Sequence, residues 1–179
     1  MKRLTLLRHA KSSWDDPVAR DFDRPLNAKG HRAGRTVGEE MRRLGLSFDA
    51  VVASPAARVV ETLEEVAIGF GNPLTPRYDQ RIYLASLESL LEVLHSVDDR
   101  VGSLLLVGHS PGLERLALYL AGVKDKPLRR SVETKYPTGA IIEINIPVSH
   151  WRDADEGEGT MTRFIRPRDL DPALGPEFS

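Results

Sequence analysis

Short apolar runs and longer segments with helical spacing follow one another along the chain. The apolar runs are typical of buried β-strands, and apolar residues that recur every three or four positions are typical of helices packed on one side. We interpret as strands the runs 4–7, 48–53, 103–108, 139–146 and 161–165. Because these strands alternate with helical segments, the pattern predicts an α/β fold with a mostly parallel central sheet and helices on both faces.

Three of the helices are marked by cap residues as well as by their spacing. Asn27 is expected to cap the first of them. Ser54 as N-cap and Pro55 at the first helical position predict the start of the second, which puts Arg58 in its first turn. Ser86 is expected to cap the third. A fourth helix follows the run 103–108 directly.

Other segments show neither pattern. We expect 72–82 to be irregular, 124–138 to be a charged loop, and the acidic, glycine-containing stretch 149–160 to be the loop of a hairpin. The C-terminal stretch has three prolines and little apolar content, so a mobile tail is expected over 167–179. With no repeat and no internal linker, residues 1–166 are predicted to form a single domain.

Composition narrows the classes of function. The chain has 179 residues, and its 25 basic and 26 acidic residues leave a net charge of −1, which gives no electrostatic case for a nucleic-acid or membrane partner. The absence of cysteine excludes disulfides, thiol catalysis and thiolate metal sites. No apolar run approaches a membrane span, and the first run is too short for a signal peptide. We therefore expect a soluble, cytoplasmic protein.

Candidate chemistry follows two of the predicted strands. The first strand ends in Arg8-His9, and the run 103–108 is followed by His109, just before a helix N-terminus. An arginine fork can bind two oxygens of a phosphoryl group while an imidazole attacks it or transfers a proton. Taken singly, each of these residues has the plain alternative of a polar side chain in a loop.

The argument for a site is stronger when these residues are taken together with Arg58. The carboxyl ends of neighbouring parallel strands lie together, so Arg8, His9, Arg58 and His109 would converge on one small volume. Without an anion such a cluster would be costly through mutual repulsion. The sequence therefore predicts a phosphate pocket, on the condition that the strand order makes these strands neighbours.

Three segments that contain these residues resemble the signatures of the histidine phosphatase superfamily: LRHAKSS at 7–13, ASPAARVVET at 53–62 and VGHSPG at 107–112. The first of them, with DRPLN at 23–27 and YPTGA at 136–140, resembles the SixA-type phosphohistidine phosphatases. The resemblance covers about residues 1–170. It implies a phosphoglycerate mutase-like fold, a three-layer α/β/α sandwich.

The same resemblance implies roles for the four residues. His9 would be the nucleophile and carry a transient phosphoryl group, while Arg8, Arg58 and a protonated His109 would bind the phosphate and stabilise its charge. His9 must be neutral at the attacking nitrogen, with its other ring N–H held by an acceptor such as a backbone carbonyl. Ser12 would add a hydrogen-bond donor. No cofactor and no metal are implied.

The chain departs from many members of the superfamily at the general acid. Where those members carry a glutamate, this sequence has Gln80, which cannot donate a catalytic proton, and the neighbouring Asp79 is the candidate acid. An alkoxide leaving group needs such a donor, whereas imidazole, whose conjugate acid has a pKa of about 6.5, needs far less help. The missing glutamate therefore favours phosphohistidine as the substrate.

The prediction is a metal-independent phosphatase that removes phosphate from phosphohistidine on a partner protein, a phosphocarrier or a histidine phosphotransfer domain. Two alternatives stay open from the sequence. One is a phosphatase for small phosphomonoesters with Asp79 as the acid. The other is a non-catalytic module that binds phosphate or phosphohistidine.

Overall fold

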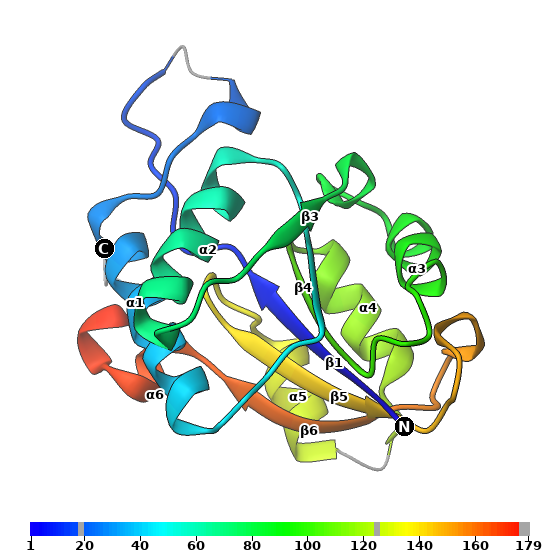
Figure 1. Ribbon diagram of the computed structural model, residues 1–179. Coiled ribbons are helices and arrows are strands. Elements are labelled where there is room, and N and C mark those ends of the chain that lie inside the picture. Colours follow the sequence, from blue (N-terminus) through cyan, green and yellow to red (C-terminus); the bar gives the residue numbers. More distant parts are fainter. Residues whose placement is uncertain (18–19, 124–125, 176–179) are drawn as a thin grey trace.

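The structure, a computed structural model, describes residues 1–17, 20–123 and 126–175 (Figure 1). Within these residues one six-stranded sheet has the order β3-β2-β4-β1-β5-β6. Its strands are β1 Lys2–Arg8, β2 Ala50–Ala53, β3 Pro76–Tyr78, β4 Ser103–Gly108, β5 Ile141–Ile146 and β6 Thr160–Ile165.

The sheet is mixed, with its parallel part in the centre. β3, β2, β4 and β1 run parallel to one another, whereas β5 is antiparallel to β1 and forms an antiparallel hairpin with β6. The expected mostly parallel sheet and the hairpin near the C-terminus are therefore confirmed. The order also puts the carboxyl ends of β2, β4 and β1 side by side, which is the arrangement that the predicted pocket requires.

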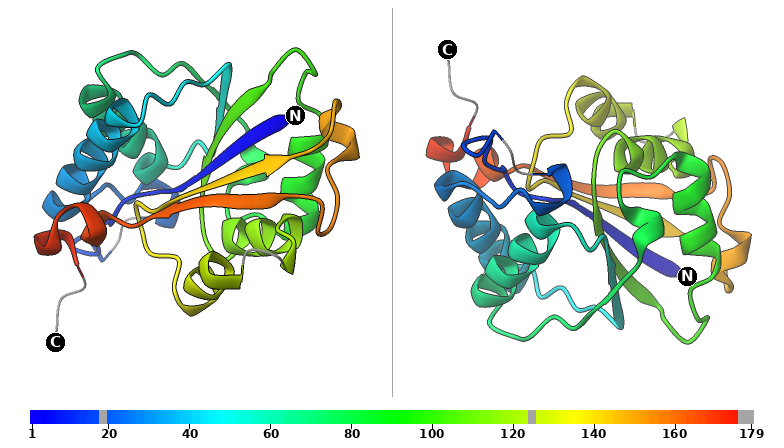
Figure 2. Two further views of the ribbon diagram at one scale, coloured as in Figure 1. Left: turned by 90° about the horizontal axis from the view of Figure 1, so that it is seen from below. Right: turned by 90° about the horizontal axis from the view of Figure 1, so that it is seen from above.

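Helices cover both faces of the sheet, as expected (Figure 2). The helices α1 and α2 cover one face, and α3, α4 and α5 cover the other. A short helix, α6, lies against α1. Their bounds are α1 Ala28–Arg43, α2 Ala57–Phe70, α3 Leu87–His95, α4 Gly112–Leu120, α5 Lys126–Thr134 and α6 Pro167–Leu170. The three-layer α/β/α architecture is thus present.

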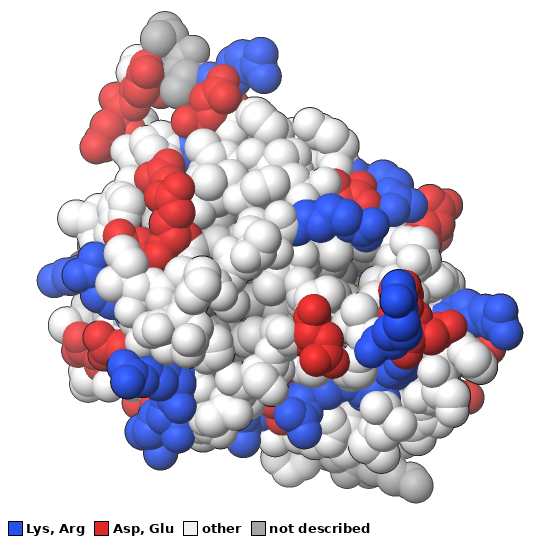
Figure 3. Space-filling model, in the orientation of Figure 1, with Lys and Arg blue, Asp and Glu red and all other residues white. Residues whose placement is uncertain are grey.

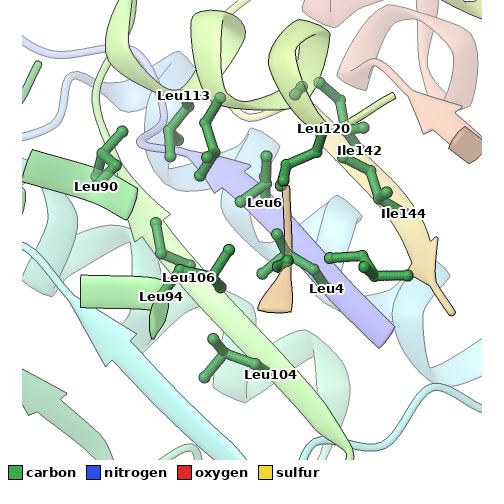
Figure 4. Close-up of a cluster of buried hydrophobic side chains, with 14 of the residues drawn as sticks. Leu4, Leu6, Leu90, Leu94, Leu104, Leu106, Leu113, Leu120, Ile142 and Ile144 are labelled. Carbon is green, nitrogen blue, oxygen red and sulfur yellow. The ribbon is translucent and has the colours of Figure 1, made fainter. Parts of the chain in front are cut away.

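The two faces of β1 explain its continuous apolar sequence. Leu4 and Leu6 are fully buried in the larger core, together with leucines of β4, α3 and α4 (Figure 4). Leu7 points to the other face and belongs to the core formed with α1 and α2. A strand that is covered on both sides reads as an unbroken apolar run, because both sets of alternating side chains are inside.

Close packing of α1 on α2 depends on small residues. A Cβ atom at Gly38 would lie 2.2 Å from the carbonyl oxygen of Val66, and one at Gly69 would lie 2.1 Å from that of Arg35. Both distances are far inside van der Waals contact, so each glycine lets the two backbones touch. This contact fixes where α2 begins relative to the sheet, and therefore where its first turn lies.

Three local predictions were wrong. Residues 126–134 form α5 and not a loop, because Leu128 and the buried Val132 lie four residues apart and pack against the core among many charged neighbours. The helix α2 begins at Ala57 with Ala56 at the cap position, and not at Ser54, whose backbone N–H still bonds to Val107 of the sheet. The stretch 72–82, expected to be irregular, contains the short edge strand β3.

The C-terminal stretch contains structure up to residue 175. After α6, a 3₁₀ turn forms at Pro172–Leu174, and Pro167 is buried beside Gly139. Residues 176–179 lie outside the described residues, and the domain boundary at residue 166 and the mobility of the tail stay predictions.

The surface carries no broad field of one sign on the face that Figure 3 shows, where acidic and basic side chains are interspersed. In the part of the chain that the structure describes, no helix is long and apolar enough to cross a membrane.

Candidate active site

Four of the candidate residues meet at the carboxyl edge of three adjacent strands. Arg8 ends β1 and is in register with Gly108, the last residue of β4, so His9 and His109 follow neighbouring strands. Their ring centroids are 5.3 Å apart. Arg58, in the first turn of the helix that follows β2, comes within 3.2 Å of His109 Nδ1 through its Nη2 atom. The strand order therefore brings together the residues that the sequence could place only on separate loops.

His9 has one ring nitrogen fixed and the other uncommitted. Its Nδ1 lies 2.7 Å from the carbonyl oxygen of Ala10. A carbonyl can only accept, so Nδ1 carries the proton and Nε2 carries the lone pair. Burial lowers the pKa of His9 to about 3, and the charges around it, among them that of Arg58, act in the same direction. The ring is therefore neutral at pH 7, as a nucleophile must be.

The loop that carries His9 is held from two sides. The buried hydroxyl of Thr62, on α2, accepts a hydrogen bond from the Ala10 N–H at 2.9 Å and donates to the carbonyl of Arg58 at 2.6 Å. On the other side, the N–H of Gly139 donates to the carbonyls of Arg8 and His9, each at 3.0 Å. The imidazole is thus positioned by α2 and by the segment that leads into β5.

His109 makes a hydrogen bond at each of its two ring nitrogens, and the protonated state expected for it beside a bound phosphate stays a prediction. Arg58 donates to Nδ1, so the ring proton is on Nε2, which donates to Ser54 Oγ at 2.8 Å. Burial and the charge of Arg58 lower the pKa of His109 to about 4. The side chain of Ser54 therefore orients an active-site imidazole. Its serine-proline sequence pointed to a helix cap instead, and no pattern in the chain indicated the contact.

Arg58 is oriented by an acidic residue that sequence reasoning missed. Its Nη1 donates to the Asp21 carbonyl at 2.8 Å and its Nη2 to the Asp21 carboxylate at 3.1 Å, while Tyr83 donates its hydroxyl to the same carboxylate at 2.6 Å. Partial burial raises the pKa of Asp21, but the hydrogen bond from Tyr83 and the charge of Arg58 outweigh it and lower the pKa to about 2. Asp21 therefore stays ionised and holds the guanidinium.

Arg8 retains a donor for a ligand. Its Nη1 donates to the carbonyl of Tyr136 at 2.8 Å, whereas its buried Nε has no hydrogen-bond partner among the described residues. Burial lowers the pKa of this guanidinium. A buried N–H without a partner is costly unless a ligand satisfies it. Together with the guanidinium of Arg58, it gives the site the donor chemistry of an oxyanion pocket.

Two further sequence candidates lie outside this cluster. The hydroxyl of Ser12 accepts a hydrogen bond from Arg24, next to a bridge between Ser12 and Leu26. The carboxylate of Asp79 is bound by Arg81, with Nη2 2.7 Å from Oδ2, and this hydrogen bond lowers the pKa of Asp79. In the described residues, no group of three or more metal-ligating side chains occurs that could hold a metal ion.

The two imidazoles predict an acid-sensitive fold. Their folded pKa values of about 3 and about 4 lie below the value of about 6.5 for an unfolded histidine, so stability is lost as the pH falls from 6.5 towards 4. The slope is up to about 1.4 kcal/mol per pH unit for each histidine. Urea unfolding at several pH values measures the free energy of unfolding. This free energy should fall less steeply with decreasing pH for His109→Gln than for wild type. An equal dependence would contradict the prediction, and the exposed His150→Gln is the matched control.

Comparisons with known proteins agree with the geometry. The model of the histidine phosphatase superfamily (branch 1) matches residues 4–82. An uncharacterised protein of Mycobacterium tuberculosis is 34% identical over 164 residues, or 90% of this chain and 100% of the relative. The phosphohistidine phosphatase SixA of Escherichia coli is 26% identical over 173 residues, which are 92% of this chain and 94% of the relative. A solved structure described as SixA of Agrobacterium tumefaciens has a TM-score of 0.78 and 25% sequence identity. The match covers 93% of this chain and 98% of that one.

The matched segment contains Arg8, His9 and Arg58, and the other comparisons extend the likeness over most of the chain. The resemblance inferred from the three motifs is confirmed, and so is the phosphoglycerate mutase-like fold that it implied. The chain therefore belongs to the histidine phosphatase superfamily, as a SixA-like hydrolase with phosphatase activity.

Proposed function

We propose that this phosphatase hydrolyses phosphohistidine on a partner protein through a phosphoryl intermediate on His9. The observation that carries the proposal is the state of the His9 ring, which is neutral, with its Nδ1 proton held by Ala10 and its Nε2 lone pair beside two arginines. One of the similar proteins, SixA of Escherichia coli, is described as a phosphohistidine phosphatase.

The reaction proceeds in two displacements. Nε2 of His9 attacks the phosphorus, and the bond from phosphorus to the substrate nitrogen breaks, leaving its electron pair on the substrate imidazole. Arg8 and Arg58 bind the equatorial phosphoryl oxygens, where charge is spread in the transition state. The bound dianion raises the pKa of His109, whose Nδ1 then takes up a proton in place of the hydrogen bond from Arg58 and becomes a further donor. Water next attacks phospho-His9, which releases inorganic phosphate and restores the imidazole.

The leaving group decides the substrate class. Asp79 is engaged by Arg81 and is ionised at neutral pH, so it has no proton to give to an alkoxide. A phosphohistidine ring that carries a proton on its other nitrogen leaves as neutral imidazole, without an acid from the enzyme. This supports a phosphocarrier or a histidine phosphotransfer domain as the partner, rather than a small phosphomonoester that would use Asp79 as the acid.

Phosphate release, measured in the presence of EDTA, tests the proposal. We expect kcat/KM for a phosphohistidine protein to exceed that for ethyl phosphate by about 100-fold or more, the usual size of a general-acid contribution. Asp79→Asn should leave turnover of the phosphohistidine protein unchanged. Comparable turnover of the two substrates, with loss of ethyl phosphate hydrolysis in Asp79→Asn, would establish the small-molecule alternative. Binding of phosphate without any release would establish the binding module.

Asp21→Asn should weaken catalysis by releasing Arg58. The amide keeps the shape of the carboxylate but removes the charge that faces Arg58 Nη2, and it leaves a single oxygen to accept from Arg58, Tyr83 and Arg24. We expect kcat to fall by about 10-fold, because a misoriented donor loses part of its transition-state stabilisation. The matched control is Asp23→Asn in the same 3₁₀ turn, whose carboxylate pairs with the exposed Arg20. Equal kcat values for Asp21→Asn and the control would contradict this positioning role.

A further inference from the structure

A second pocket lies at the same edge of the sheet, on the side of β5. It has a volume of about 510 Å³, within the range of pockets that hold small molecules. Residues of the N-terminal part of α1 and of α6 line it, and these two helices are neighbours (Figure 2). The chain before β5 and the residues at the end of β1 and just after it complete the lining. None of the catalytic steps described above uses this pocket.

The pocket is strongly basic. Five cations line it from four separate parts of the chain, and the described residues that line it include no aspartate or glutamate. The chain as a whole is nearly neutral, so this concentration of charge is local. The cationic lining residues are Arg8, Lys11, Lys29, Lys135 and Arg168. Several cations around one concave site favour a multiply charged anion, because a single negative charge would leave most of them repelling one another.

The remaining lining residues are suited to an organic ligand. Ala33, Pro137, Pro167 and Leu174 contribute apolar surface between the cations. Lys29 donates a hydrogen bond to the carbonyl of Gly175, which fixes part of this wall. A pocket of this size, with apolar surface between fixed charges, exceeds the needs of one phosphate ion.

Arg8 connects this pocket to the catalytic site. It lines the pocket, and it is also the residue whose buried Nε has no hydrogen-bond partner among the described residues and is available to a phosphate at the catalytic cluster. We propose that the basic pocket is a second anion site, for a small organic molecule with two or more phosphate groups. A ligand there binds the guanidinium of Arg8, which is then less available to the substrate phosphate, so the ligand inhibits phosphate hydrolysis at His9. The binding itself does not depend on which phosphorylated substrate His9 serves.

Methylenediphosphonate is a suitable probe, because its P–C–P bridge cannot be hydrolysed. Calorimetry on the full chain at fixed ionic strength measures its binding to wild type and to the double variant Lys29→Gln/Arg168→Gln. We expect the double variant to bind about 10-fold more weakly or worse, since two charge-assisted contacts to the anion are lost. The matched control, Arg32→Gln/Arg152→Gln, removes two exposed cations and should bind as wild type does.

A third variant, Arg58→Gln, separates the two sites. If the probe occupies the basic pocket, Arg58→Gln still binds it. In Lys29→Gln/Arg168→Gln, the probe no longer inhibits hydrolysis of p-nitrophenyl phosphate, and hydrolysis without the probe persists. Loss of binding in Arg58→Gln with retention in the double variant would put the probe in the catalytic site and overturn the proposal. No binding by wild type at millimolar probe would overturn it as well. These outcomes leave the assignment of phosphohistidine to His9 unaffected, because that assignment is tested by substrate turnover.

Discussion

His9→Ala is expected to lower phosphate release by about 10⁴-fold or more, which is the size of effect that removal of a nucleophile has in other covalent mechanisms. The variant retains Arg8, Arg58 and His109, so it keeps donors for the phosphate oxygens and should still bind phosphate. It loses the nucleophile, which is the lone pair on His9 Nε2. This lone pair is available in wild type because the Ala10 carbonyl holds the ring proton on Nδ1. The expected result is therefore a loss of kcat with phosphate affinity largely retained.

Rapid quenching with a radiolabelled phosphohistidine protein provides the decisive measurement. Wild type should acquire label that is stable to alkali and labile to acid, as a phosphorylated imidazole is, and His9→Ala should acquire none. His31→Ala and His95→Ala are the matched controls, because these histidines lie on α1 and α3. Label that persists in His9→Ala would assign the nucleophile to another residue. Equal turnover by His9→Ala and wild type would remove the covalent mechanism altogether.

The low pKa of His9 also separates this nucleophile from an ordinary exposed histidine. Burial keeps the ring neutral down to a pH of about 3, so the fraction of reactive Nε2 does not fall between pH 7 and pH 5. A histidine with the usual pKa of about 6.5 would be mostly protonated at the lower of these values. The low pKa values have a cost in stability. In acid, His9 and His109 bind protons in the unfolded chain but not in the folded one, so the free energy of unfolding falls.

The sequence located the main catalytic candidates because their signals are local. Arg8, His9 and His109 each follow an apolar run that is buried on both faces, and such a run marks a strand by composition alone. Whether the two strands are neighbours depends on pairing between residues about a hundred positions apart, which no local pattern encodes. The family motifs supplied that information, and the sheet order β2-β4-β1 agrees with it.

The residues that orient the catalytic groups could not be found in this way. Asp21 reaches Arg58 across 37 positions of sequence, from a 3₁₀ turn in a loop with no periodic signal. Ser54 has the sequence context of a helix cap, and only the fold turns its hydroxyl towards His109. The helix α5 was missed for a related reason, since its charged residues outnumber the two apolar ones that pack. Contacts formed by tertiary packing outweigh local propensity at all three places.

Arg58→Lys should lower kcat by about 100- to 1000-fold, although the positive charge is kept. In the structure the guanidinium makes three contacts at once, to the Asp21 carbonyl, to the Asp21 carboxylate and to His109 Nδ1. A lysine ammonium is a point charge on a flexible stem and cannot form the planar fork that spans these groups and two phosphoryl oxygens. The shape of the cation, and not its charge alone, is therefore expected to determine the rate.

A second variant, Arg58→Gln, distinguishes charge from shape through His109. The charge of Arg58 lowers the pKa of the His109 imidazole, so Arg58→Gln should raise that pKa above the wild-type value, whereas Arg58→Lys should raise it less. NMR titration of the ring protons measures the shift, and a thermal melt of each variant shows that it is folded. Arg81→Lys, at an exposed arginine that binds Asp79, is the matched control and should retain kcat. If Arg58→Lys also retains kcat, the arginine acts only as a charge, and the orientation of its fork by Asp21 has no part in catalysis.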